Sequence, residues 1–243
     1  MVYMKKISIP MKKNFDEKDA GSLKTIIIAV HGFASSKNSF VISKIATKLI
    51  ENNIGLVCFD LPGHGDRKNE VFTIPACLES IRKVENYVRS FYSGTIGFTG
   101  ASLGGFLLLR YLDDNQNKYG KIILRSPALS QYDVWVKDVS ENGRELIKGL
   151  ESGRNYFLNS MEVDVSVLDD YFKFDIFNHL NINQDVKLMY ATKDITISNK
   201  NIKKLAKIKG WDVFPLKCAD HFCRRDEDIE NIANLFLKII NDN

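Results

Sequence analysis

A serine between glycines, in the run Gly100-Ala101-Ser102-Leu103-Gly104, is the feature that most limits how this chain can fold. Residues 95–99 before it suit a short buried strand, and residues 103–112 after it form an apolar, proline-free segment that suits a buried helix. A sharp strand-to-helix turn needs glycine where backbone crowds backbone. The pattern therefore predicts a tight turn that exposes the Ser102 hydroxyl at its apex. The alternative interpretation is a glycine-rich loop with an incidental serine.

Apolar strand candidates alternate with amphipathic helices along most of the chain. This alternation predicts an α/β fold with a mainly parallel sheet flanked by helices. Pro215 lies in the last candidate strand and places it at a sheet edge, because proline cannot donate a hydrogen bond to a neighbouring strand. The candidate strands are residues 3–9, 25–30, 55–61, 95–99, 121–125, 186–191 and 211–216.

The alternation breaks down between residues 129 and 183. This stretch is too long for a simple connection and is rich in aromatic residues. We expect it to be a cap inserted over the strand ends, with residues 1–128 and 184–243 forming the core. Its aromatic side chains are candidates for lining an apolar site, although buried aromatics more often belong to a core. They are Tyr132, Trp135, Tyr156, Phe157, Tyr171, Phe172, Phe174 and Phe177.

Composition excludes several classes of protein. A net charge of +4 on 26% charged residues is too balanced to indicate a nucleic-acid partner. Residues 200–207 carry four lysines on one helical face, with Ile202, Leu205 and Ile208 on another, which predicts a solvated helix face. The four cysteines lack the spacing of a metal site or a disulfide framework, so we expect no metal and no cofactor. We expect a cytoplasmic protein without a membrane partner, because no signal peptide or spanning segment is recognisable.

A serine nucleophile needs a base within hydrogen-bond reach and a third group to orient that base. His221 follows the last candidate strand, at the sheet end where the Ser102 turn also lies, and is the best candidate base. Asp194 follows the penultimate strand and gives the chain order of nucleophile, acid and histidine. Asp60 is a weaker candidate acid, and Asp220 adjoins His221 in an extended loop, where neighbouring side chains point apart.

Three motifs together make the chain resemble the α/β-hydrolases, specifically capped serine hydrolases. They are residues 31–33 (His-Gly-Phe), residues 60–65 (Asp-Leu-Pro-Gly-His-Gly), and the Ser102 turn with the downstream Asp194 and His221. The resemblance covers nearly the whole chain and implies an oxyanion hole formed by the backbone N–H groups of Phe33 and Leu103. It also implies structural roles for the histidines at positions 31 and 64. The charged stretch 15–21 departs from the family's usual edge hairpin and predicts a trimmed one.

Within that family the chain looks most like small bacterial carboxylesterases, including cinnamoyl and feruloyl esterases. The resemblance implies hydrolysis of small esters, including aromatic hydroxycinnamoyl esters, through Ser102, His221 and Asp194 with an acyl-enzyme intermediate. Monoacylglycerol lipases, serine aminopeptidases and acyltransferases share these motifs and stay open as alternatives. A non-catalytic ligand receptor on the same fold is a further alternative, because a fold does not fix a function.

Overall fold

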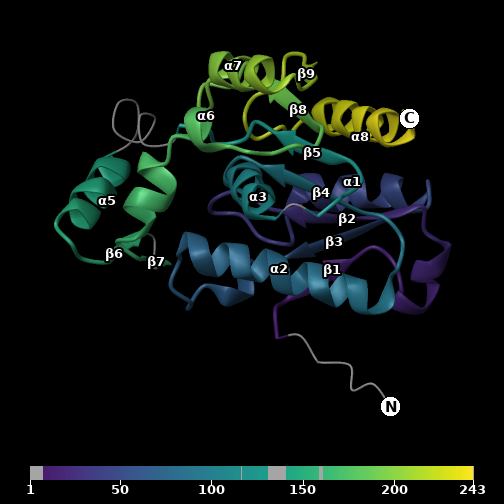
Figure 1. Cartoon of the computed structure of the whole chain (residues 1–243), viewed down its shortest axis with the longest axis horizontal. Helices are drawn as coiled ribbons and strands as arrows, with labels where there is room; N and C mark the ends of the chain where they lie inside the picture. Colours follow the sequence, from purple (N-terminus) through teal and green to yellow (C-terminus); the bar gives the residue numbers. More distant parts are fainter. Residues whose placement is uncertain (1–7, 116, 131–140, 159–160, 243) are drawn as a thin grey trace.

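The computed structural model describes residues 8–115, 117–130, 141–158 and 161–242. Within these residues seven strands form one sheet in the order β1-β3-β2-β4-β5-β8-β9, with helices on both faces (Figure 1). All neighbouring pairs are parallel except β1 with β3. The sheet is therefore mainly parallel, as predicted. The strands are β1 (Met11–Lys13), β2 (Thr25–Val30), β3 (Ile54–Phe59), β4 (Ile96–Ala101), β5 (Ile122–Arg125), β8 (Val186–Ala191) and β9 (Val213–Leu216).

The sheet separates two apolar cores, because alternate residues of a strand point to opposite faces. Ile27 and Ala29 of β2 face helices α1 (Phe40–Ile50) and α8 (Asp226–Asn241). Ile26 and Ile28 face the opposite core. Helices α2 (Ile74–Phe91), α3 (Leu103–Asp114) and α7 (Asn199–Lys209) cover that second face. Both faces of β2 are consequently buried, which accounts for its continuous apolar sequence.

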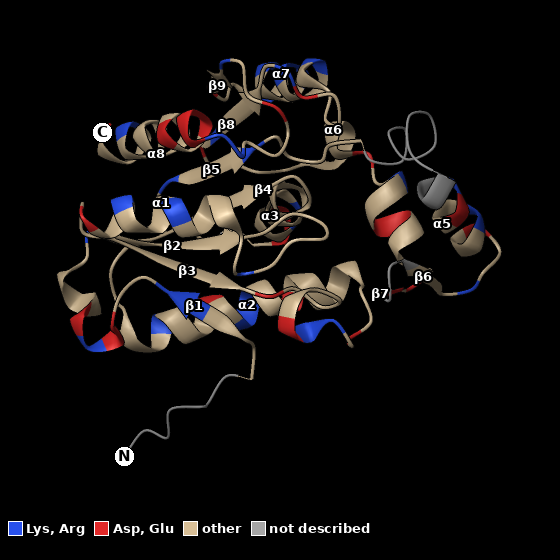
Figure 2. Cartoon of the chain, turned by 180° about the vertical axis from the view of Figure 1, so that it is seen from behind, with Lys and Arg blue, Asp and Glu red and all other residues tan. Residues whose placement is uncertain are grey.

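The long helices begin where the sequence supplies suitable end groups. The hydroxyl of Thr73 accepts the N–H of Ala76 at 3.1 Å and so caps α2, and a proline occupies the first turn of that helix. Three acidic residues, 226–228, occupy the first turn of α8, where the helix dipole favours negative charge. Figure 2 shows this acidic turn in red and the Lys238 turn at the other end of α8 in blue.

The two edges of the sheet test two predictions, a trimmed hairpin at the β1 edge and a proline-containing edge strand at β9. Strand β1 has only three residues, in agreement with a trimmed edge hairpin. A strand over residues 3–9 was expected, but residues 3–7 lie outside the described part of the chain, and Ser8 and Ile9 are not in a strand. The prediction for the other edge is confirmed, because β9 carries Pro215 and pairs with β8 alone among the described strands.

The stretch between β5 and β8 contains α5 (Glu141–Glu151), the hairpin β6 (Tyr156–Leu158) and β7 (Met161–Val163), the π-helical turn η3 (Leu168–Lys173), and α6 (Ile176–His179). Figure 1 shows α5, β6 and β7 to one side of α2 and α3. The segment is anchored on α3, where the rings of Tyr171 and Phe106 lie 5.0 Å apart. It also reaches the chain just before α2, where the N–H of Phe72 bonds to the carbonyl of Glu162 at 2.7 Å.

The burial of residues in the lysine-rich helix α7 agrees with the sequence prediction except at one residue. Its four lysines at positions 200, 203, 204 and 207 are exposed, and Ile202 and Leu205 are buried, as predicted. Ile208 is not buried with them, because 52% of its surface is exposed. An α-helix turns by about 100° per residue, so a step of six residues places Ile208 about 120° from Ile202 and outside the buried arc.

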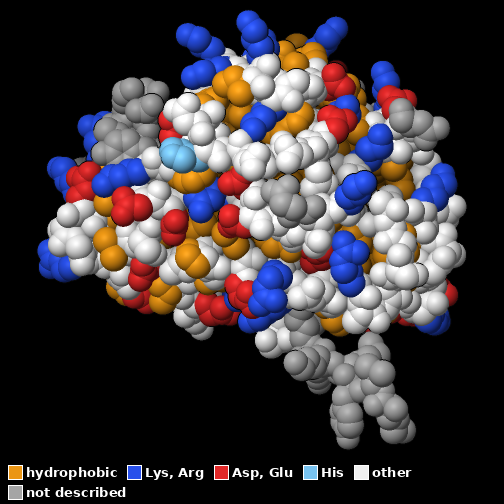
Figure 3. Space-filling view, viewed as in Figure 1, with side chains coloured by type: hydrophobic (Ala, Val, Ile, Leu, Met, Phe, Trp, Pro, Cys, Tyr) orange, Lys and Arg blue, Asp and Glu red, His pale blue; other side chains and the backbone are white. Residues whose placement is uncertain are grey.

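The outer surface carries charges of both signs. Figure 3 shows Lys and Arg side chains distributed among Asp and Glu on one face of the molecule. Within the described residues, we find no helix with the length and apolar character that crossing a membrane requires.

Candidate active site

Ser102 lies at the turn between β4 and α3, in the conformation that the sequence predicts for it. Its φ of 52° and ψ of −116° place a non-glycine residue in a strained region of backbone space. Hydrogen bonds on both of its backbone groups hold this conformation. The N–H of Ser102 donates to the carbonyl of Arg125 at 3.0 Å, and its carbonyl accepts the N–H of Ala128 at 3.0 Å.

The flanking glycines are required by close packing of backbone against backbone. A Cβ atom at Gly100 would lie 2.6 Å from the carbonyl carbon and oxygen of Gly104. A Cβ atom at Gly104 would lie 2.6 Å from the carbonyl carbon of Val30 and 2.7 Å from the carbonyl oxygen of His31. The turn therefore packs directly against the end of β2, and larger residues would force the backbone apart.

His221 and Asp194 meet although 27 residues separate them in the sequence. The Nδ1–H of His221 donates to Oδ2 of Asp194 at 2.8 Å. Oδ1 of Asp194 accepts the N–H groups of Thr196 at 2.9 Å and Ile197 at 2.8 Å. Burial alone would raise the pKa of Asp194, but the hydrogen bonds from His221 and Ile197 outweigh it, so the pKa lies below its usual value. Asp194 is therefore ionised at neutral pH and holds the His221 ring through Nδ1, with Nε2 facing away from the carboxylate.

The other carboxylates considered from the sequence are engaged elsewhere. Oδ1 of Asp220 accepts the N–H groups of Phe222 at 3.0 Å and Cys223 at 2.8 Å, so it shapes the loop that carries His221. Asp60 pairs with Lys37 at 2.7 Å, and its side chain is fully buried. Neither carboxylate has a hydrogen bond to the ring of His221 in the described part of the chain.

Two further histidines lie in the loops after β2 and β3. The Nδ1–H of His31 donates to the carbonyl of Gly32 at 2.8 Å, and its Nε2 accepts the N–H of Leu61 at 3.1 Å. The Nδ1–H of His64 donates to the carbonyl of Pro62 at 2.9 Å. Burial, together with the nearby charge of His64, lowers the pKa of His31 to about 4, so His31 is neutral and ties the two loops together.

The backbone groups expected to form an oxyanion hole belong to the turn after β2 and to the start of α3. Leu103 is the first residue of α3, so its N–H is in the first turn, where a helix supplies no acceptor of its own. Phe33 follows Gly32, at which a Cβ atom would lie 3.3 Å from the carbonyl oxygen of Ala101 and 3.5 Å from Cβ of Ser102. The turn after β2 therefore packs directly on the turn that carries the serine.

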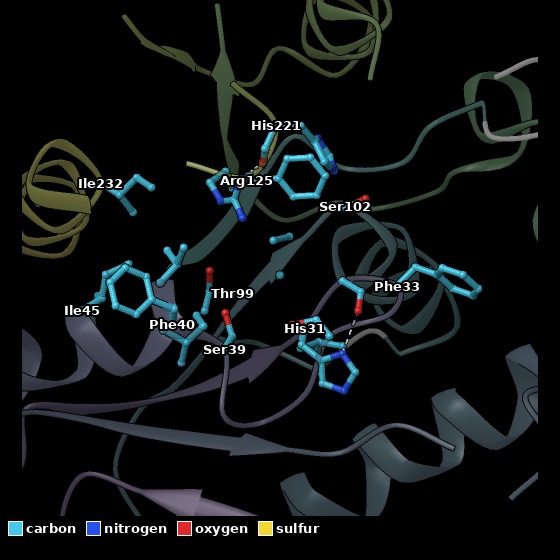
Figure 4. A pocket seen from close by; sticks show the side chains of 18 of the residues that line it. His31, Phe33, Ser39, Phe40, Ile45, Thr99, Ser102, Arg125, His221 and Ile232 are labelled. Atoms are coloured by element: carbon cyan, nitrogen blue, oxygen red, sulfur yellow. Dashed lines mark hydrogen bonds between the residues drawn. The ribbon is translucent and has the colours of Figure 1, made fainter. Parts of the chain in front are cut away.

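Ser102 and His221 line one cavity of about 440 Å³, together with Phe33 (Figure 4). Figure 4 shows His221 and Ser102 on neighbouring parts of its wall. No hydrogen bond links the Ser102 hydroxyl to His221 among the described residues. Much of the apolar part of the wall comes from helices α1 and α8. These helices contribute Phe40, Val41, Ile42 and Ile45 from the first and Ile232 and Phe236 from the second.

The aromatic residues of the stretch 129–183 do not line this cavity where the structure describes them. Tyr171 and Phe172 are buried in the core, and 65% of the surface of Phe157 is exposed. Tyr132 and Trp135 lie outside the described residues. The aromatic rings that do line the cavity include those of Phe40 and Phe236.

Sequence reasoning also missed Arg125, which ends β5 and lines the cavity beside His221. The available signal was a charged residue directly after three apolar residues at the carboxyl end of a parallel strand. In the described ranges we find no group of three His, Cys, Asp or Glu side chains arranged to hold a metal ion.

Comparison with known proteins supplies a family match. The Hydrolase_4 family model, described as serine aminopeptidase, S33, matches residues 21–173, which is more than half of the chain. The monoacylglycerol lipases abhd6-A and abhd6-B of Xenopus laevis are each 23% identical over 166 residues, a match that covers 67% of this chain and 47% of each relative. The chain thus spans about half the length of these curated relatives.

Solved structures show the same fold. Est1E from Butyrivibrio proteoclasticus, in a structure with ferulic acid bound, aligns with a TM-score of 0.74 at 14% identity over 100% of both chains. The monoacylglycerol lipase of Paleococcus ferrophilus aligns with a TM-score of 0.68 at 18% identity, covering 96% of this chain and 98% of the other.

Proposed function

Because this chain belongs to the serine aminopeptidase S33 family of α/β-hydrolases and is a serine hydrolase, we propose that it cleaves small carboxylic esters with Ser102, His221 and Asp194. One observation carries the proposal: the 2.8 Å hydrogen bond that fixes the His221 ring on a buried, ionised carboxylate, next to the strained serine turn in the same cavity. An imidazole held in this way presents Nε2 as a base.

The proposed reaction is acyl transfer to water in two steps. Ser102 Oγ attacks the ester carbonyl while Nε2 of His221 accepts the hydroxyl proton. The Phe33 and Leu103 N–H groups bind the oxygen that becomes negatively charged, and His221 then protonates the departing alcohol. Water activated by His221 releases the acid from the acyl-enzyme. Hydrogen bonds of this kind are often long in a free enzyme and tighten on substrate binding, so the missing bond between Ser102 and His221 fits the free state.

A more specific part of the proposal concerns the acyl group. The cavity wall contains the rings of Phe40 and Phe236, which suit a flat aromatic acyl group such as hydroxycinnamoyl. The structural neighbour Est1E binds ferulic acid, which fits this suggestion. Methyl ferulate should then be hydrolysed faster than an aliphatic ester of equal length. A clear preference for medium acyl chains would favour a lipase, as in the Xenopus relatives, and a preference for aminoacyl amides would favour a peptidase.

We also propose that residues 129–183 form a cap over the core of residues 1–128 and 184–243. The support is topological, because α5, β6, β7, η3 and α6 are inserted between the adjacent strands β5 and β8. In this assignment the cap rests on α3 and on the chain before α2, and the residues that line the cavity belong to the core.

The assay that tests the nucleophile is hydrolysis of p-nitrophenyl butyrate by purified protein. Ser102→Ala should reduce kcat by about 10⁶-fold, because its hydroxyl forms the covalent intermediate. Ser39→Ala is the matched control, since Ser39 lines the same cavity, and it should keep most of the activity. Both variants should retain the circular dichroism spectrum of the wild type. Activity near the wild-type level in Ser102→Ala would contradict the proposal.

Two other outcomes separate the alternatives. A receptor on this fold would react with a fluorophosphonate probe but would not sustain turnover of an ester. A hydrolase would react with the probe and would also turn over the ester repeatedly. An acyltransferase would divert the acyl group to an added alcohol, which is measured by the partition of products between the acid and the new ester.

A further inference from the structure

Arg125 places a cationic group in the wall of the cavity that contains Ser102. The three residues before it in β5 are fully buried, and Arg125 itself is half-buried at the carboxyl end of the strand. Figure 4 shows its guanidinium group below His221, with a nitrogen directed away from His221 toward Thr99. A charge at this position is costly to desolvate unless a partner compensates it.

The hydrogen bonds of Arg125 satisfy only one part of the guanidinium group. Nη1 donates to the backbone carbonyl of His221 at 2.7 Å and to Sγ of Cys223 at 3.4 Å. Among the described residues, no carboxylate lies within 4 Å of Arg125, and no Asp or Glu lines the cavity. The N–H groups on Nε and Nη2 form the other edge of the guanidinium plane, and two parallel N–H groups match the two oxygens of a carboxylate.

We propose that Arg125 binds a carboxylate carried by the substrate, so that the preferred esters have a free carboxylate in addition to the ester group; this rests on the proposed esterase function. The apolar wall from α1 and α8 contacts the carbon chain, and Arg125 binds the charged end. A carboxylate fits better than a phosphate dianion, because a single guanidinium edge offers one positive charge and two parallel donors. The ionised carboxylate supplies the counter-charge that the described residues of the cavity lack.

Matched pairs of esters test the charge alone. Monomethyl adipate and methyl hexanoate have the same length and differ by a carboxylate in place of a methyl group at the end of the acyl arm. The pair 4-acetoxybutanoate and butyl acetate makes the same exchange in the alcohol arm. The wild type should show a kcat/KM about 10- to 100-fold higher for the anionic member of one pair, the range expected for hydrogen bonds to a charged group.

The effect of Arg125→Gln must be measured as the ratio of kcat/KM for the anionic and the neutral ester, because Arg125 also donates a hydrogen bond to the carbonyl of His221. Loss of that hydrogen bond lowers turnover of anionic and neutral esters alike, whereas loss of the carboxylate contact lowers turnover of the anionic ester alone. The anionic-to-neutral ratio of kcat/KM should therefore fall about tenfold or more. Arg224→Gln is the matched control, since Arg224 lines the same cavity but is exposed and stacks on Phe222, and it should change the ratio less than about threefold.

A measurement on the wild type covers the case in which Arg125→Gln does not fold. Adipate should inhibit hydrolysis of p-nitrophenyl butyrate competitively and at least tenfold more strongly than hexanoate, and added salt should weaken this inhibition. Equal kcat/KM within both ester pairs, or a ratio that falls only in Arg224→Gln, would overturn the proposal. Loss of neutral-ester hydrolysis in Ser102→Ala tests the esterase function separately, and stabilisation of that variant by monomethyl adipate over methyl hexanoate tests the carboxylate site without turnover.

Discussion

Replacing Gly104 by alanine is the sharpest structural test of the serine turn. Gly104 lies in the first turn of α3 and packs against the carboxyl end of β2. An added Cβ would approach the carbonyl carbon of Val30 to 2.6 Å and the carbonyl oxygen of His31 to 2.7 Å. These are backbone atoms of a central strand and of the loop that follows it, so they cannot move aside as a flexible side chain would. Either α3 or the end of β2 must shift.

The size of the effect follows from this contact. Overpacking a core costs about 1–3 kcal/mol, and a contact with backbone belongs at the upper end, at about 3 kcal/mol. For a chain of this length each kcal/mol lowers Tm by about 2–4 °C, so Gly104→Ala should melt about 6–12 °C below the wild type. Activity should fall as well, since a shifted β2–α1 turn displaces the N–H of Phe33 from the serine.

Thermal unfolding followed by circular dichroism, with p-nitrophenyl butyrate hydrolysis beside it, measures both effects. Gly21→Ala is the control, because a Cβ there meets nothing within 4 Å. Gly32→Ala should be intermediate, since its Cβ would lie 3.3 Å from the carbonyl oxygen of Ala101. The expected order of destabilisation is Gly104 above Gly32 above Gly21. If Gly104→Ala and Gly21→Ala melted at the same temperature, the close packing described for the turn would be wrong.

Two further changes test buried groups in the loops after β2 and β3. Because folded His31 stays neutral down to about pH 4 while the unfolded chain takes up a proton near pH 6.5, the free energy of unfolding should decrease by up to about 3 kcal/mol as pH falls from 6.5 to 4. Urea titrations should show a smaller decrease in His31→Gln, and an unchanged decrease would refute the assignment. Lys37→Met removes the ion-pair partner of the buried Asp60 carboxylate, which keeps only its backbone hydrogen bonds from residues 37 and 66, and should cost about 3 kcal/mol. Arg82→Met, which breaks an exposed pair, should lower Tm far less, and equal losses in the two variants would contradict this reasoning.

Local features of the sequence were sufficient to predict six of the seven described strands of the sheet and the serine turn, whereas the first described strand lies at Met11–Lys13, after the range 3–9 that was expected for it. The glycines around Ser102 and the apolar runs that form β2 and β4 each carry their signal within a few residues. The proline of β9 likewise identified an edge strand from one residue. Where a pattern had to be extended, as from Ile202 and Leu205 to Ile208, prediction failed, because burial depends on how much of a helix its neighbours cover.

The lining of the cavity could not be predicted in the same way. Phe40 and Phe236 lie almost 200 residues apart and meet because α1 and α8 pack on the same face of the sheet. The number of aromatic residues in the stretch 129–183 made them candidates for lining an apolar site. Composition, however, does not distinguish a ring in a core from a ring in a cavity wall. Tyr171 packs on Phe106 and belongs to the core.

The order of strands in the sheet explains why Ser102 and His221 line one cavity, and why Asp194 binds His221, although these residues are far apart in the chain. Strand β5 lies between β4, which ends at Ser102, and β8, which ends before Asp194. Its last residue, Arg125, accepts the N–H of Ser102 with its carbonyl and donates to the His221 carbonyl with its side chain. Strands are about 4.8 Å apart, so the ends of β4 and β8 are about 10 Å apart, and β5 fills the space between them. A single residue of β5 thus contacts both the turn that carries the serine and the loop that carries the histidine, and any shift of this strand end moves both.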